Sequence, residues 1–106
     1  MADARKQGFA VVVIYIGTES VEINIKRVAK RVELGGHNVP EEDVRRRYSR
    51  SLANLVLAVP LADQIVIFDN SRAAGYQLAG VIQNGAATWF EPLADWAANI
   101  RAQLQP

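Results

Sequence analysis

Cysteine is missing from this sequence, and histidine and methionine are scarce. The 106 residues contain no cysteine, one histidine and one methionine. Without cysteine, the chain can form no disulfide, no thiolate nucleophile and no zinc-finger site. The sequence contains no serine nucleophile elbow with which the single histidine, His37, could form a catalytic pair. The nearby acids at positions 41–43 lack the spacing of metal ligands. We therefore expect neither a catalytic triad nor a metal centre.

Long apolar runs and a net charge of one sign are also missing. The longest apolar run, residues 9–16, is far too short to span a bilayer, and the first seven residues lack the apolar core of a signal peptide. A formal charge of +1 gives no general electrostatic reason for binding nucleic acid or membrane. We expect a cytoplasmic protein with no nucleic-acid or membrane partner, in which any cationic function is local.

The order of apolar and polar residues predicts a single α/β domain over residues 1–106. Hydrophobic residues make up 50% of the chain and charged residues 22%, which is typical of a globular protein. Two apolar runs without alternation predict strands buried on both faces, as in a parallel sheet. Helical periodicity and an Asn-Gly turn complete the pattern. In order, we predict a strand at 9–16, a helix at 21–34, a helix opened by residues 38–40 and ended by Pro60, a strand at 64–68, a hairpin of 76–83 and 87–90, and a closing helix at 92–104.

Residues 34–50 hold most of the side chains that carry chemistry. Three acids at positions 41–43 each stand four residues before one of three arginines at positions 45–47. Such pairs stabilise a helix by only a few tenths of a kcal/mol each. Because consecutive helical residues point about 100° apart, the three arginines cannot all face one ligand. Arg45 and Arg47 flank the apolar stripe of this predicted helix, which consists of Val44, Tyr48, Leu52, Leu55 and Val59. Spacing alone leaves both an ion-paired surface and a phosphate site open.

Two more arginines and the polar residues after a predicted strand are further candidates for a binding site. Arg27 and Arg31 stand one turn apart in the first predicted helix, where periodicity alone favours a solvated face. Asp69 and Asn70 follow the second predicted strand, at the position where α/β proteins place ligands, although an ordinary turn has the same composition. Since a planar guanidinium bonds two oxygens at once, anion binding by arginine is the chemistry that remains.

The string Leu-Gly-Gly-His-Asn-Val-Pro-Glu-Glu-Asp-Val-Arg-Arg-Arg-Tyr, at 34–48, resembles the lid segment of zeta-toxin-like P-loop kinases, also described as predicted ABC-type ATPases. Residues 21–32 fit the helix that leads into that lid, and residues 51–55 and 67–71 fit the helix and strand that follow it. The resemblance covers nearly the whole chain in order. It implies a partial P-loop kinase-like fold with parallel strands, a helical lid region, a C-terminal β-hairpin and a closing helix.

The resemblance also implies a function, namely transfer of the γ-phosphoryl group of ATP, with Mg, to a hydroxyl of a small molecule. In that family, lid arginines close over the phosphates, where negative charge spreads in the transition state. Carried over by position, Arg45 and Arg47 are the candidate catalytic clamp. The other candidates for nucleotide binding are Arg27, Arg31, Arg46, Arg50, His37, Asp69 and Asn70.

The phosphate cradle of that family, Gly-x-x-x-x-Gly-Lys-Ser/Thr, does not occur in the 106 residues. The early strand-borne aspartate that activates the acceptor has no counterpart either. We therefore expect the lid-bearing, C-terminal half of such a kinase, inactive by itself. Because its apolar strands would lack neighbours, we expect a homo-oligomer or a complementary P-loop-bearing chain, and an antitoxin stays open as a partner. The alternative is a non-catalytic dimerisation or interaction module of the same fold.

Overall fold

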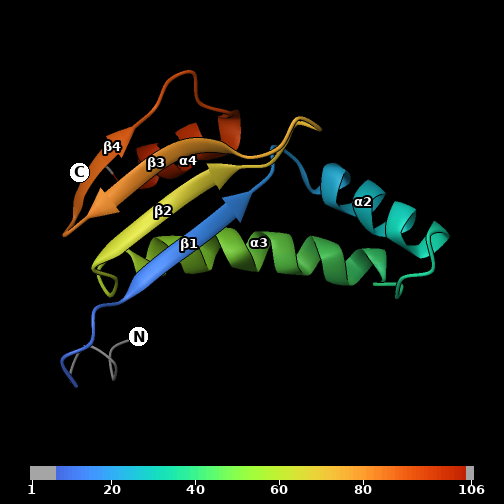
Figure 1. Cartoon of the computed structure of the whole chain (residues 1–106), viewed down its shortest axis with the longest axis horizontal. Coiled ribbons are helices and arrows are strands. Elements are labelled where there is room, and N and C mark those ends of the chain that lie inside the picture. The colour runs from blue at the N-terminus through green and yellow to red at the C-terminus, as the bar shows by residue number, and fades with distance from the viewer. Residues whose placement is uncertain (1–6, 105–106) are drawn as a thin grey trace.

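The computed structural model describes residues 7–104, which form a mixed α/β structure with a four-stranded sheet and three helices (Figure 1). The elements in chain order are β1 (Val12–Gly17), α2 (Val21–Glu33), α3 (Glu41–Ala58), β2 (Gln64–Asp69), β3 (Gln77–Gln83), β4 (Ala86–Trp89) and α4 (Asp95–Leu104). The α/β class expected from the sequence is confirmed.

The sheet is mixed rather than parallel throughout. Its strand order is β1-β2-β3-β4, with β1 and β2 parallel and the other two pairs antiparallel. A parallel pair requires a long crossover, and α2 and α3 form it. The predicted hairpin is confirmed, because Asn84 and Gly85 adopt positive φ angles of 50° and 82° between β3 and β4. Those angles suit the primed turns that match the twist of paired strands.

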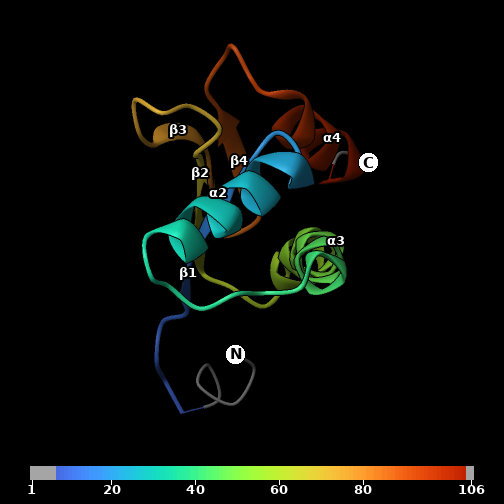
Figure 2. The ribbon, with the colours of Figure 1, turned by 90° about the vertical axis from the view of Figure 1, so that its right-hand side faces the viewer.

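One face of the sheet carries the core. Helices α3 and α4 lie on the same side of the sheet (Figure 2), against alternate side chains of the strands. We call this side the covered face. Ile65 and Ile67 of β2 are fully buried there, and Val13 and Tyr15 lie beside them in register. The remaining core residues come from the two helices and include Leu55, Ala58, Trp96, Ala97 and Ile100.

The opposite side of the sheet, which we call the open face, has no helix against it within residues 7–104 (Figure 2). Val12, Ile14 and Ile16 of β1 point to this side and are 56%, 66% and 49% exposed. The prediction that residues 9–16 form a strand buried on both faces is therefore wrong for this chain. The reason is that α3 and α4 both lie on the covered face, while α2 extends beyond the end of the sheet (Figure 1).

Helix α2 lies beside α3 and buries none of its residues. It ends where the Gly-Gly pair predicts, since Gly35 adopts a φ of 94° and the Gly36 N–H donates to the Arg31 carbonyl at 2.8 Å. By contrast, α3 buries Val44 and Leu55 of its predicted apolar stripe, and also Ala58 at its end. Thus α2 is attached to the rest of the molecule mainly through the loops at its two ends and through α3. The polar side chains of α2 are therefore accessible.

Several boundaries differ from the prediction. Strand β1 begins at Val12 instead of Phe9, because the backbone of Val11 bonds to Asp63: the Val11 N–H donates to Asp63 Oδ2 at 2.6 Å. Helix α3 begins at Glu41, with Pro40 at the N-cap instead of in the first turn. Helix α4 begins at Asp95, three residues after the predicted start. No helix within residues 7–104 is long and apolar enough to cross a membrane.

Candidate functional site

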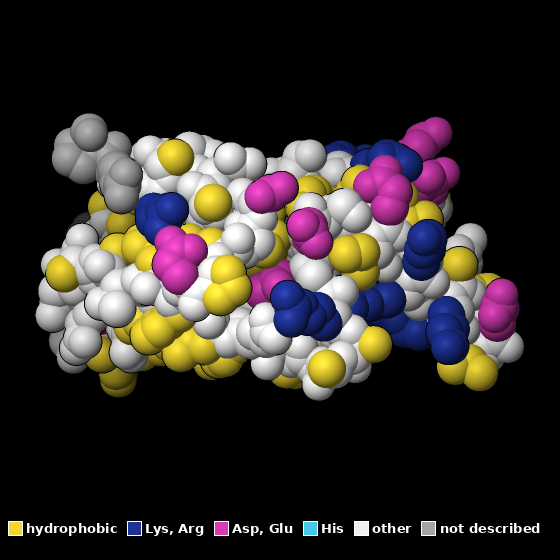
Figure 3. All heavy atoms as spheres, turned by 90° about the horizontal axis from the view of Figure 1, so that it is seen from above, with side chains coloured by type: hydrophobic (Ala, Val, Ile, Leu, Met, Phe, Trp, Pro, Cys, Tyr) yellow, Lys and Arg dark blue, Asp and Glu magenta, His cyan; other side chains and the backbone are white. Residues whose placement is uncertain are grey.

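A cavity of about 470 Å³ lies among the carboxyl end of β1, the helix α2 and the first half of α3. We call it the arginine cavity. Its position at the carboxyl ends of the parallel strands is the usual place for ligands in α/β sheets. Lys and Arg side chains gather at the end of the molecule where α2 lies (Figure 3). The polar lining includes the hydroxyl groups of Tyr15, Tyr48 and Ser51, and the side chains of Arg27, Arg31, Arg47, Asn24, Thr18 and Asn70.

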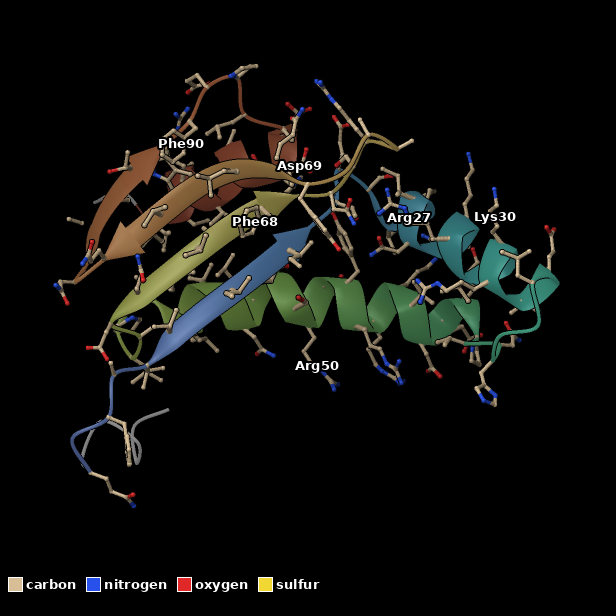
Figure 4. All side chains as sticks on the ribbon, viewed as in Figure 1. Arg27, Lys30, Arg50, Phe68, Asp69 and Phe90 are labelled. Carbon is tan, nitrogen blue, oxygen red and sulfur yellow. The ribbon has the colours of Figure 1, made fainter. Side chains whose placement is uncertain are left out.

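Three guanidinium groups line this cavity without a compensating carboxylate. Arg27 and Arg31 stand one turn apart on α2, and Arg47 faces the same space from α3 (Figure 4 labels Arg27). Among residues 7–104, none of the three forms a salt bridge. Uncompensated guanidinium groups that share one concave space attract an anion, which each of them can bond through two oxygens.

Arg45 and Arg46 lie outside the arginine cavity and are ion-paired. The Arg45 guanidinium lies 3.2 Å from Glu22 and 3.0 Å from Glu41, and so links α2 to α3. Arg46 lies 2.8 Å from Asp43. Of the predicted pairs four residues apart, the structure forms Glu41–Arg45, whereas Asp43 is paired with Arg46.

The pKa values of Glu22 and Arg45 differ from their ordinary values. The pKa of Glu22 is lowered, first by a hydrogen bond from its own backbone N–H and then by Arg45. The pKa of Arg45 is raised by its hydrogen bonds to Glu41 and Glu22. Arg45 is therefore already engaged by two carboxylates, so that of the two predicted clamp residues Arg47 is the one that lines the cavity.

The remaining candidates are scattered. Asn70 lines the arginine cavity, and Arg50 lines a second cavity one turn further along α3. His37 is exposed in the loop between α2 and α3 and lines neither cavity. Asp69 Oδ1 accepts hydrogen bonds from Trp96 Nε1 at 2.9 Å and from Ser71 Oγ at 2.6 Å, which is a structural use of that carboxylate.

Sequence reasoning missed the hydroxyl groups of the arginine cavity. Tyr48 donates to the Thr18 carbonyl at 2.8 Å, Thr18 Oγ1 donates to Asn24 Oδ1 at 2.9 Å, and Ser51 donates to the Tyr15 hydroxyl at 3.0 Å. Tyr48 has the spacing of the apolar stripe of its helix, and Thr18 stands where a helix cap is common, so neither residue type nor spacing marks them as site residues. The available signal was position, because Thr18 directly follows β1 just as Asn70 follows β2.

The two phenols of this network are held in the neutral form. Burial raises the pKa of Tyr15, and the hydrogen bond from Ser51 lowers it only in part. Burial is also the main cause of the raised pKa of Tyr48. At neutral pH these groups therefore act as uncharged hydrogen-bonding groups and do not cancel the positive charge of the arginines.

A few hydrogen bonds between the ends of β1 and β2 fix the loop that leads into α2. The Glu19 N–H donates to Ser71 Oγ at 2.7 Å, and the Asn70 N–H donates to the Gly17 carbonyl at 2.8 Å. Gly17 itself must lack a side chain, since a Cβ there would lie 2.5 Å from the Trp96 ring. These contacts join the ends of β1 and β2 and set the direction in which α2 leaves the sheet.

The fold and the cavity together define an α/β protein with a cationic site at the ends of its parallel strands. No family model matches the chain, and no solved structure matches it. An uncharacterized protein of Haemophilus influenzae is 46% identical over 48 residues, which are 45% of this chain and 34% of that relative. The match thus spans about a third of the relative's length.

Proposed function

We propose that this chain is the lid-bearing part of an ATP-dependent small-molecule kinase similar to the zeta toxins, acting in the cytoplasm. The observation that carries the proposal is the set of three uncompensated arginines, Arg27, Arg31 and Arg47, in one cavity at the carboxyl ends of β1 and β2. The sequence resemblance of residues 34–48 to a kinase lid supports the same function independently.

A triphosphate suits this donor set. The cavity volume of about 470 Å³ falls within the range of ordinary small-molecule sites. Three guanidinium groups offer enough paired donors for several phosphate oxygens, and Asn24 and Asn70 add amide groups. Residues 7–104 contain no group of three or more His, Cys, Asp or Glu side chains that could hold a metal ion. Because Mg that accompanies ATP is usually held by the phosphates, waters and one or two carboxylates, the proposal assigns no residue of this chain to the metal.

In this proposal, Arg27 and Arg31 bind the phosphates from α2, and Arg47 approaches them from α3. Positive charge on both sides of a transferring phosphoryl group stabilises the negative charge that spreads in the transition state. Arg45 keeps the two helices together through Glu22. Since the 106 residues contain no P-loop lysine, the proposal assigns transfer to a hydroxyl acceptor to an assembly with a complementary P-loop-bearing chain.

Calorimetric titration with Mg-ATP and with inorganic tripolyphosphate tests the proposal. Both should bind, and replacing Arg27, Arg31 or Arg47 by alanine should weaken binding by about tenfold or more, since hydrogen bonds to charged groups contribute about 1.5–3 kcal/mol. Arg46→Ala is the matched control, because Arg46 is exposed, paired with Asp43 and outside the cavity. Absence of binding, or an equal loss in Arg46→Ala, would contradict the proposal.

A non-catalytic dimerisation or interaction module is the second candidate function, and the exposed apolar side chains of the open face favour it. In that case the chain should self-associate, and the alanine variants of the cavity arginines should leave self-association unchanged. Light scattering over a range of protein concentrations, with and without tripolyphosphate, distinguishes the two functions. A dimer that binds no polyphosphate would favour the interaction module.

A further inference from the structure

The outer edge of β1 lies beside a second cavity, which we call the edge groove. It has a volume of about 460 Å³ and lies between β1 and α3. Val13, Leu55 and Ala58 give it an apolar floor, and Arg50 and Asn54 add polar groups from α3. Because β1 is the first strand of the sheet, no strand within residues 7–104 pairs with its outer edge.

This edge lacks the features that usually prevent strand addition. Natural edge strands carry lysines, prolines, bulges or inward-pointing charges. The β1 sequence, Val-Val-Ile-Tyr-Ile-Gly, contains no proline and no charge, and the register irregularity of the sheet lies between β2 and β3. The outward backbone N–H and C=O groups of β1 are therefore open to hydrogen bonding by an extended chain.

The charges around the edge groove are all of one sign. Arg47 and Arg50 line the groove, no carboxylate does, and neither arginine forms a salt bridge within residues 7–104. Figure 4 shows Arg50 extending from α3 on the side of the free edge of β1. A second copy of this chain, paired edge to edge through β1, would bring two sets of these arginines together. Like-charge repulsion therefore disfavours a second copy here and favours an acidic partner.

We propose that the β1 edge binds an extended segment of another polypeptide, which adds to the sheet as a strand. Alternate side chains of an added strand point to opposite faces, so that one set enters the edge groove against Val13 and Leu55. Within this set, apolar side chains lie against the floor of the groove, and an acidic side chain two residues along the added strand pairs with Arg50. The proposal goes beyond the kinase function, because it involves no nucleotide and shares only Arg47 among the three phosphate-binding arginines.

The test uses a fluorescein-labelled peptide that repeats Val-Thr-Glu-Thr, which places valine and glutamate on the same face of a strand. The same peptide with lysine in place of glutamate is its control. Fluorescence anisotropy, without nucleotide, should show at least about tenfold tighter binding of the glutamate peptide. The Arg50→Glu variant should lose or reverse this preference, and Arg50→Ala should fall between it and the unchanged protein. Arg72→Glu is the matched control, since Arg72 is exposed and lines neither cavity.

Hydrogen exchange locates the bound peptide. The backbone amides of Val12–Gly17 should exchange more slowly with the glutamate peptide, whereas those of α2 should not change. Equal binding of the two peptides, or unchanged exchange in β1, would overturn the proposal. Slower exchange in β1 that grows with protein concentration and without peptide would also overturn it, because a second copy would then occupy the edge. Loss of polyphosphate binding in Arg27→Ala or Arg31→Ala would leave these results unaffected.

Discussion

The two faces of the sheet have similar apolar composition and very different environments. On the covered face, Ile67 is 0% exposed and is packed by α3 and α4. On the open face, Ile14 is 66% exposed, although it lies in the adjacent strand and is the same residue type. The difference comes from the placement of the helices and not from the strands themselves. Burial in this chain is decided by which side the connecting helices take.

The same contrast separates the two groups of arginines. Arg45 and Arg46 are neutralised by carboxylates of their own or a neighbouring helix, and Arg27, Arg31 and Arg47 are not. The unpaired arginines and the exposed apolar side chains both mark surfaces that no other group within residues 7–104 neutralises or covers. We therefore regard the open face, the β1 edge and the arginine cavity as surfaces that a ligand or partner completes.

The largest expected effect compares two isoleucines. Ile67→Ala should lower the free energy of unfolding by about 2–5 kcal/mol, since it leaves a cavity in the core. Ile14→Ala should lower it by about 0.5 kcal/mol or less, as for other surface substitutions. Urea denaturation at low protein concentration measures both changes. Losses of similar size would mean that the open face is covered in solution, and a concentration-dependent loss in Ile14→Ala would identify a second copy as the cover.

An intermediate effect is expected at Asp69, which anchors Trp96 against the covered face. Asp69→Ala leaves the indole N–H of Trp96 without its acceptor and should cost about 1–3 kcal/mol in the free energy of unfolding. Asp69→Asn keeps an acceptor oxygen and should cost less. Urea denaturation, followed by near-ultraviolet circular dichroism of the two tryptophans, Trp89 and Trp96, checks both. If the two variants lose the same stability, the carboxylate charge matters rather than the hydrogen bond, and the role assigned to the Asp69–Trp96 hydrogen bond would be wrong.

Much of the local structure was predictable from residue order. The stripe that places Leu55 in the core has helical spacing, and Asn84-Gly85 marks a hairpin turn without reference to the rest of the chain. The one-sided burial of β1 was not predictable, because an unbroken apolar run contains no alternation that would distinguish its two faces. The side on which a helix lies is a property of the whole chain.

The site was predictable in its residue types and only partly in its geometry. The sequence places Arg27 and Arg31 on one helical stripe, since that depends on spacing within one helix. It does not reveal that Arg47 faces the same cavity, or that Glu22 engages Arg45 across a separation of 23 residues. Both facts depend on how α2 lies against α3, which is set by the network of Ser71, Asn70 and Gly17 at the strand ends.

The smallest expected effect is a loss of stability at alkaline pH, which arises from the ionisation of Tyr15 on the covered face. The pKa of Tyr15 is raised by burial from its ordinary value of 10.0, so the folded chain holds this proton to higher pH than the unfolded chain does. Its contribution to stability is therefore complete below pH 10 and is lost as pH rises through the folded-state pKa. The midpoint of urea denaturation, followed from neutral pH to about pH 11, should fall at the alkaline end.

Tyr15→Phe should reduce that alkaline decline while lowering stability at neutral pH, because Ser51 loses its hydrogen-bond acceptor. Tyr48, whose pKa is also raised by burial, should account for part of the decline that remains. Ser51→Ala is the matched control, since it removes the hydrogen bond and keeps the buried phenol. An alkaline decline that is the same in Tyr15→Phe as in the unchanged protein would show that the phenol of Tyr15 is open to solvent, and the covered face would then be less well sealed at β1 than at β2.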